Sequence, residues 1–437
     1  MNLSKHLIGI VLILALIFAA GSARCASIST SEFDVRFDRA NHLLAVTDIV
    51  TMQIDSGDHE LTLLFSSRNR LDSIIESSKN SPVKFVRKGV DTLIVTATEN
   101  QRIAGTTMLR FVYAVPLAAE DSVLILLDRG HRWYPMIPDN VVSTELKVQV
   151  PKEFGVVACG DLVAVDSLQA EATYRWKSAI PIFKNALVLY RRDRFVDALA
   201  PHSGEGLVRL ISSTLSDSER AAVIKHTSDV LHFACSTIGP YPHTAYTVLE
   251  IPGMDGSDVG SGLVMVGSEP LKAVARGETE ALDLVTIQQW LGAGAFGQFL
   301  APGFWFFCIS IPHYERMLYV RQISGSDLFE RQLTARYQKY KEVAGSAGDA
   351  ALLTIDYPNT REKGLVCYAK GPYVLNQVRL ALGDSLWTQF AATLYATGKG
   401  KVVTYGEFVG LLGRFDASGK AREKLERGLT ETGPVED

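Results

Sequence analysis

The side chains that could bind a metal ion or activate water are widely spread along this chain. Two histidines one helical turn apart would direct both imidazoles at one metal ion, but none of the nine histidines has another at H-x-x-x-H spacing. His243 lies in a predicted loop, and Cys308 and His313 lie in or just after a long apolar run. These three residues are either a relocated metal site or, more simply, separate core and surface side chains.

Two further patterns fit catalytic or binding motifs only in part. Residues 292–297 match G-x-G-x-x-G, but they follow a predicted helix and open no βαβ unit, so we expect no dinucleotide site. Gly260-Ser261-Gly262 lacks the spacing of G-x-S-x-G, so a serine hydrolase is not favoured.

The elements that would position such side chains change character along the sequence. From residue 33 to about 190, short β-branched and aromatic runs alternate with clusters of Gly, Asp, Asn and Ser. Several short strands without helical periodicity are typical of a β-sandwich. We therefore predict an antiparallel β-sandwich-like N-terminal domain over residues 27–200, with a boundary near 198–205.

Beyond that boundary the hydrophobic period becomes about 3.6 residues, which indicates helices. Ser216 and Glu219 form a capping-box pattern, and Gly239-Pro240 ends the helix that follows. We next expect a strand at 246–251 and a helix at about 278–291. Further helices are predicted at 327–343, 368–382, 385–395 and 405–412. The chain is therefore expected to be an α+β protein with a mainly helical second domain over residues 205–437.

The N-terminus has the pattern of an export signal. Lys5 and His6 precede a charge-free stretch, residues 7–23, which ends in small residues. A charged region, an apolar region and a small-residue cleavage zone are typical of a secretory signal, so we assign this role to residues 1–26. An uncleaved membrane anchor is the alternative, because the stretch has the minimum length of a spanning helix. In both cases we expect an exported protein, periplasmic or secreted.

Composition excludes several classes of protein. The 437 residues are 47% apolar and 21% charged, which is enough for two domains with large cores. The net charge of -4 gives no basic footprint for nucleic acid. The four cysteines beyond the N-terminal segment contain no C-x-x-C motif, and we favour buried thiols over two disulfides. They are Cys159, Cys235, Cys308 and Cys367.

Five short motifs occur in the order found in one known family. They are residues 132–138 with 148–151, then 238–242, 256–263, 284–292 and 367–371. The fourth, Leu-Val-Thr-Ile-Gln-Gln-Trp-Leu-Gly, is similar to a helix that reads H-E-x-x-H-x-W-x-G, and it keeps Trp290 and Gly292. Together the motifs resemble the aminopeptidase N-like gluzincins, which are zinc metallopeptidases with a β-rich domain followed by a thermolysin-like domain. The resemblance implies that fold for most of the chain.

The same resemblance implies that the zinc chemistry is lost. The family's two histidine ligands fall at Leu284 and Gln288, and its general base falls at Val285. Leucine cannot bind zinc, a neutral amide is a poor zinc donor, and valine cannot accept a proton from a metal-bound water.

Three further family positions follow from the resemblance. The third zinc ligand, a glutamate, falls at Phe307, one residue from Cys308. The glutamate that pairs with the substrate's free amine falls at Val259, beside Asp258. The family's oxyanion-stabilising tyrosine is retained as Tyr368, which cannot catalyse hydrolysis alone.

We therefore expect an exported pseudopeptidase with no metal or other cofactor, binding a peptide or a protein partner of the cell envelope. One alternative is a zinc metallopeptidase whose site is relocated or divergent. A second is a structural subunit of an envelope assembly, which exposure of the apolar residues 304–311 would favour. No nucleic acid or dinucleotide is expected to bind, and contact with a membrane is expected only through the N-terminal segment.

Overall fold

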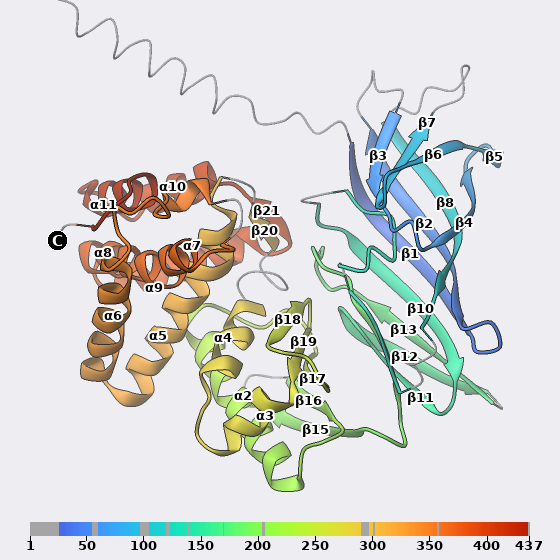
Figure 1. The fold of residues 1–437 in the computed structure, drawn as a ribbon, viewed down its shortest axis with the longest axis horizontal. Helices are drawn as coiled ribbons and strands as arrows, with labels where there is room; N and C mark the ends of the chain where they lie inside the picture. Colours follow the sequence, from blue (N-terminus) through green and yellow to red (C-terminus); the bar gives the residue numbers. More distant parts are fainter. Residues whose placement is uncertain are drawn as a thin grey trace, which may run out of the picture.

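The computed structural model describes most of the chain beyond the predicted export signal (Figure 1). The described residues are 26–54, 60–96, 105–118, 123–128, 130–137, 140–168, 170–202, 206–289, 297–299, 302–355 and 358–435. Residues 1–25, Trp290, Gly292 and most of the glycine-rich run at 292–297 lie outside this part of the chain. The interpretations that depend on those residues stay predictions.

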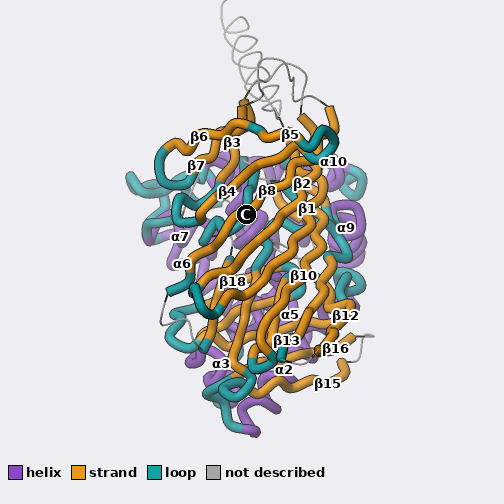
Figure 2. Tube along the Cα trace, turned by 90° about the vertical axis from the view of Figure 1, so that its right-hand side faces the viewer, coloured by secondary structure: helices purple, strands orange, loops and turns teal. Residues whose placement is uncertain are grey.

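A large sheet of eight strands forms one layer of the N-terminal domain (Figure 2). Its order is β12-β13-β10-β1-β2-β8-β4-β5, and within it only β1 and β10 pair in parallel. The strands are β1 (Ala26–Asp38), β2 (Leu43–Ile54), β4 (Arg70–Glu76), β5 (Ser81–Pro82), β8 (Gly105–Pro116), β10 (Ser143–Pro151), β12 (Asp161–Leu168) and β13 (Glu171–Lys177). Buried and exposed residues alternate along β2 and β10, as the two-residue period of a strand requires.

Two sheets of three strands cover the inner face of this layer. Their orders are β3-β7-β6 and β11-β14-β9. The strands are β3 (Glu60–Leu64), β6 (Lys84–Lys88), β7 (Thr92–Thr96), β9 (Leu124–Leu127), β11 (Phe154–Ala158) and β14 (Leu187–Arg191). Side chains from all three sheets share one hydrophobic core, in which Trp133 is fully buried against Phe33. The predicted sandwich-like domain is therefore present.

A five-stranded sheet begins the second domain, in the order β15-β16-β17-β19-β18. The strands are β15 (Val196–His202), β16 (Gly206–Ser212), β17 (Ala245–Ile251), β18 (Ser257–Gly260) and β19 (Leu263–Gly267). The three inner strands run parallel, and β15 and β18 are antiparallel edges. The segment expected to be a boundary near 198–205 thus contains much of strand β15. Pro201 is compatible with β15 because an edge strand tolerates a missing N–H.

The rest of the second domain is helical (Figure 1). Its helices are α2 (Asp217–Thr237), α3 (Ser268–Ala275), α4 (Glu280–Gln288), α5 (Ile311–Ser324), α6 (Ser326–Lys341), α7 (Arg361–Leu365), α8 (Gly371–Leu382), α9 (Asp384–Gly398), α10 (Tyr405–Gly413) and α11 (Lys420–Thr430). Three short helical turns lie between these helices. They are the π-turns η2 (Phe306–Ser310) and η4 (Val366–Lys370) and the 3-10 turn η3 (Leu352–Thr354). A two-stranded pair, β20 (Gly297–Phe299) and β21 (Lys401–Val403), completes the fold.

The capping box predicted for α2 is present with both of its hydrogen bonds. Ser216 accepts from the Glu219 amide, and the Glu219 carboxylate accepts from the Ser216 amide. The mixed α+β class and the order of the two domains are therefore confirmed. Across the described residues, the helices are too short or too polar to cross a bilayer.

Candidate functional site

Helix α4 carries three of the predicted site positions and is anchored by a buried ionic cluster. The Asp283 carboxylate, which is 1% exposed, hydrogen-bonds the His226 ring and lies 3.5 Å from Arg316 Nε. Thr279 Oγ1 donates to the same carboxylate at 3.2 Å. Arg316 Nη1 also donates to Glu280 at 3.2 Å. The acidic groups on this helix are thus engaged in fixing its position against α2 and α5.

The neutral face of α4 lies next to the η2 turn. Leu284 and Gln288 are one turn apart, so their half-buried side chains share a face of the helix. Gln288 Nε2 donates to the Cys308 carbonyl at 3.2 Å. Val285 points into the core and is 1% exposed.

The η2 turn brings the backbone carbonyl of Cys308 to Gln288. The Phe307 ring packs in the core, with its centroid 5.1 Å from that of Phe408. A π-turn winds more residues into one turn than an α-helix, so it shifts which residue faces a neighbour. Burial raises the pKa of the Cys308 thiol to about 12, while the nearby Lys184 ammonium opposes that rise.

The edge strand β18 adds one accessible ion pair to the same region. Lys184 Nζ lies 2.7 Å from Asp258 Oδ1, and this oxygen also accepts from the Val259 amide at 2.8 Å. The Val259 side chain itself is buried in the core of the helical domain. Gln289 Nε2 donates to the Gly260 carbonyl at 3.2 Å, which ties α4 to this strand.

Tyr368 lies on the η4 turn and is 39% exposed. Its ring meets the ring of His313 edge to face, with centroids 4.7 Å apart. Burial lowers the pKa of His313 to about 3, and the positive charges of Arg336 and Arg316 act in the same direction. His313 is therefore a neutral imidazole, and its Nε2 has no hydrogen-bond partner among the described residues.

The relocated metal site considered from the sequence does not assemble in the described part of the chain. No three histidine, cysteine, aspartate or glutamate side chains come together there in a group that could hold a metal ion. His243, Cys308 and His313 each contact different neighbours. The four cysteines after the N-terminal segment are free thiols.

Three residues whose types could form a nucleophilic triad meet where the two domains touch. His243 Nε2 and Ser261 Oγ are 2.8 Å apart, and His243 Nδ1 lies 3.6 Å from Asp161 Oδ2. Ser261 has no exposed surface, so no substrate can reach its hydroxyl. The Gly160 amide donates to the Ser261 carbonyl, and the Thr244 amide donates to Asp161. The cluster therefore joins the domains rather than forming an active site.

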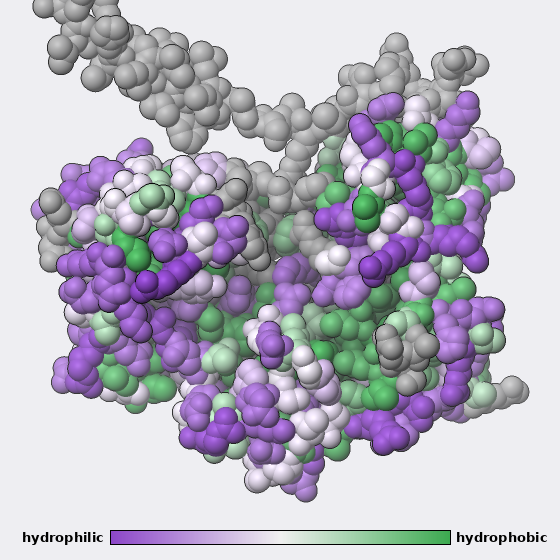
Figure 3. Space-filling view, in the orientation of Figure 1, coloured by the Kyte–Doolittle hydropathy of each residue, from purple (hydrophilic) through white to green (hydrophobic). Residues whose placement is uncertain are grey.

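The surface between the two domains is hollowed. In the orientation of Figure 1, Figure 3 shows apolar side chains reaching the surface in this hollow, while the outer rims are hydrophilic. The pairing of Lys184 with Asp258 could not be predicted from the sequence, because the two residues are 74 positions apart in the chain. No local pattern marks such a pair.

Comparison with solved structures identifies the fold. The M1 zinc metallopeptidase of Deinococcus radiodurans superposes with a TM-score of 0.73 at 16% sequence identity. The alignment covers 95% of this chain and 96% of the Deinococcus chain. Aminopeptidase A of Legionella pneumophila superposes with a TM-score of 0.76 at 13% identity, and the alignment covers 95% of this chain and 50% of the Legionella chain. The LTA4 hydrolase of yeast superposes with a TM-score of 0.73 at 13% identity, and the alignment covers 95% of this chain and 70% of the yeast chain.

The chain thus has the two-domain architecture of M1 zinc aminopeptidases, and the fold implied by the five motifs is confirmed. No protein-family model matches the sequence, and no curated protein matches it. At these identities the structural similarity shows the fold, whereas the activity of this chain has to be argued from its own residues.

Proposed function

We propose that this chain is an exported, non-catalytic peptide-binding protein built on the M1 aminopeptidase fold. One support comes from the solved structures with this fold. A mutant of the Deinococcus enzyme has been crystallised with the peptide Tyr-Ser-Ala, and the Legionella enzyme with aspartic acid. A two-domain M1 zinc metallopeptidase mutant has been crystallised with L-arginine and with L-tryptophan. The fold therefore accommodates peptides and amino acids. Export is proposed from the N-terminal signal pattern alone.

The observation that carries the proposal is the set of side chains around α4. Hydrolysis by a gluzincin requires zinc ligands and a general base on this helix. Leu284, Val285 and Gln288 supply neither, and the amide of Gln288 is engaged with the η2 backbone. The thiol of Cys308, whose carbonyl accepts from Gln288, stays protonated because burial raises its pKa to about 12. We accordingly propose that the chain holds no zinc at this place.

Binding, unlike hydrolysis, needs only complementary groups that a ligand can reach. The side chains of Lys184 and Asp258 remain 27% and 30% exposed. The Lys184 ammonium can donate to a peptide carboxylate, and the Asp258 carboxylate can accept from a peptide ammonium. The edge strand β18 next to them can present backbone groups to an extended chain.

The structural-subunit alternative lacks the feature that would have favoured it. Residues Phe306 to Ile309 and Ile311 are buried in the core of the helical domain rather than exposed as a patch. The divergent metallopeptidase alternative has no ligand group among the described residues to support it.

Titration calorimetry with the peptide Tyr-Ser-Ala tests the proposal. We expect saturable binding to the full mature chain and an intact peptide by mass spectrometry after the titration. Lys184→Ala should weaken binding about tenfold or more, because a hydrogen bond to a charged group contributes roughly 1.5–3 kcal/mol.

The matched control is Lys147→Ala. Lys147 pairs with Asp34 on the surface of the large sheet, at 2.8 Å, and is not part of the site. This variant should bind like the unmodified protein. Absence of binding, equal binding by Lys184→Ala, or hydrolysis of the peptide would each contradict the proposed function.

A further inference from the structure

A groove on the helical domain collects charged side chains that the proposed peptide site does not use. Its volume is about 350 Å³, and it is lined by residues of α2, α5 and α9 together with the start of α6. This volume is in the range of small-molecule sites. Lys184, Asp258 and Gln288 do not belong to its described lining.

Two guanidinium groups in this groove share a single carboxylate. Arg321 Nη2 donates to Asp384 Oδ2 at 3.1 Å, and Arg379 Nη1 donates to Asp384 Oδ1. Arg379 also donates to Tyr314 and Asn376, so most of its hydrogen-bonding capacity is used. The Nη1 group of Arg321 makes no hydrogen bond to any described residue. With Glu315 in its protonated form, the lining therefore has one positive charge in excess and a guanidinium with donors to offer.

The starts of two helices add to this positive potential. Helices α6 and α9 both begin at the groove, and neither has a side-chain cap. The first amides of a helix carry partial positive charge and favour anions. This contribution has the same sign as the excess charge of the two arginines.

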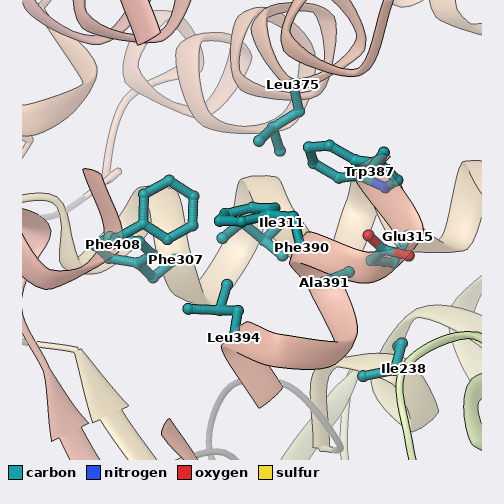
Figure 4. Close-up of a pocket in the computed structure, with 10 residues that line it drawn as sticks. All are labelled: Ile238, Phe307, Ile311, Glu315, Leu375, Trp387, Phe390, Ala391, Leu394 and Phe408. Carbon is teal, nitrogen blue, oxygen red and sulfur yellow. The ribbon is translucent and has the colours of Figure 1, made fainter. Parts of the chain in front are cut away.

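The floor of the groove carries the Trp387 indole beside the Glu315 carboxyl (Figure 4). Glu315, Trp387 and Ala391 separate the groove from a small apolar cavity of about 20 Å³ and line both (Figure 4). The Trp387 side chain is 5% exposed, and its indole N–H interacts with the Glu315 carboxyl. This donor is thus already engaged within the floor of the groove.

Glu315 does not oppose an anion at this place as an exposed glutamate would. It lies close to the Trp387 indole, at the end of the cavity opposite Phe307 and Phe408 (Figure 4). Burial raises the pKa of Glu315 to about 7, although the neighbouring Trp387 N–H acts against this rise. Near or below neutral pH, much of this carboxyl is therefore neutral.

The remaining walls of the groove are apolar. Phe233 of α2, Leu318 of α5 and Ala391 of α9 line it together with the Trp387 ring. A ligand that places an anionic group at Arg321 would therefore lay its body against hydrocarbon and an aromatic face. Burial of such a body is favourable in proportion to its apolar area.

We propose that this groove binds a small organic monocarboxylate with an apolar or aromatic body. The carboxylate lies at Arg321 and balances the single excess positive charge, while the body packs against Phe233, Leu318 and Trp387. A dianion such as phosphate would exceed the available positive charge and leave the apolar walls uncovered.

Titration of the full mature chain with 4-fluorobenzoate, followed by ¹⁹F NMR, tests this site. We expect saturable binding that 4-fluorobenzylamine does not share and that inorganic phosphate does not displace at equal concentration. Arg321→Ala should weaken the binding about tenfold, because it removes a charge-assisted pair. Arg321→Lys keeps the positive charge but loses the paired N–H donors of the guanidinium, so it should weaken the binding less. This variant also shows whether a loss in Arg321→Ala comes from misfolding.

The control is Arg331→Ala, on α6. Arg331 is exposed and does not line the groove, so this variant should bind the probe like the unmodified chain. Lys184→Ala should also leave the binding unchanged, which separates this groove from the peptide site. The inference is overturned if Arg321→Ala binds equally well, if the amine binds more tightly than the acid, or if loss of binding follows Lys184→Ala instead.

Discussion

The Asp283→Ala protein is expected to lose about 3–5 kcal/mol of unfolding free energy, the usual loss when one partner of a buried ion pair is removed. Asp283 is almost completely buried and lies between the His226 ring and the Arg316 guanidinium, which is itself 6% exposed. Truncation leaves Arg316 with only Glu280 as an acidic partner and His226 without its acceptor. Helix α4 would then lose its polar contact with His226 of α2 and keep only the Glu280–Arg316 pair to α5.

Urea unfolding followed by circular dichroism measures this loss. Asp283→Asn, which keeps the shape and can still accept a hydrogen bond, should lose less than Asp283→Ala. Glu278→Ala provides the control, because Glu278 forms only an exposed pair with Arg276 and should change the stability by less than about 1 kcal/mol. Asp283→Ala with stability within that same margin would refute the anchoring role.

The second large effect is expected at Asp48 in the β-rich domain. This carboxyl has no exposed surface. Ser31 Oγ donates to Oδ1 at 2.5 Å, and Oδ2 has no partner among the described residues. Burial raises the pKa of Asp48 to about 8, against about 3.9 in an unfolded chain. The folded protein therefore holds a proton that the unfolded chain has released between these two values.

The sign of the pH dependence follows from this proton. The contribution of Asp48 to the free energy of unfolding is fully present below about pH 4. It falls by about 1.4 kcal/mol per pH unit until the pH passes the folded pKa near 8. Asp48→Asn imitates the protonated carboxyl. It should match the unmodified chain at pH 4 and exceed it in stability at pH 8.

Denaturant unfolding of both proteins at pH 4, 6 and 8 measures the difference. Asp34→Asn is the control, because Asp34 lies on the exposed face of β1 and pairs with Lys147. Its effect should stay below about 1 kcal/mol at each pH. A stability difference for Asp48→Asn that does not grow with pH would contradict the assignment.

Local chemistry explains which elements could be predicted from the sequence. The Ser216 and Glu219 pair fixes the start of α2, because both hydrogen bonds lie within four residues. The strand at 246–251 was recognisable because β17 is buried on both faces and reads as a continuous apolar run. Strand β15 was not recognised, because its Pro and His resemble a linker and its pairing with β16 is what makes it a strand.

The candidate site was predictable only in part, because it depends on long-range geometry. The four-residue spacing of Leu284 and Gln288 indicated that both side chains lie on one face of α4. The π-turn η2, whose Cys308 carbonyl accepts from Gln288, could not be inferred from residue types. Lys184 and the groove at Arg321 arise from segments far apart in the chain, which no local motif brings together.

The zinc content of the purified mature chain tests the central claim most directly. The protein would be dialysed against a weak chelator and its metal measured by elemental analysis together with protein concentration. A non-catalytic chain with Leu284, Val285 and Gln288 on α4 should retain far less than one zinc ion per molecule. One tightly held zinc per molecule would contradict this account and would show that a metal centre exists elsewhere in the chain.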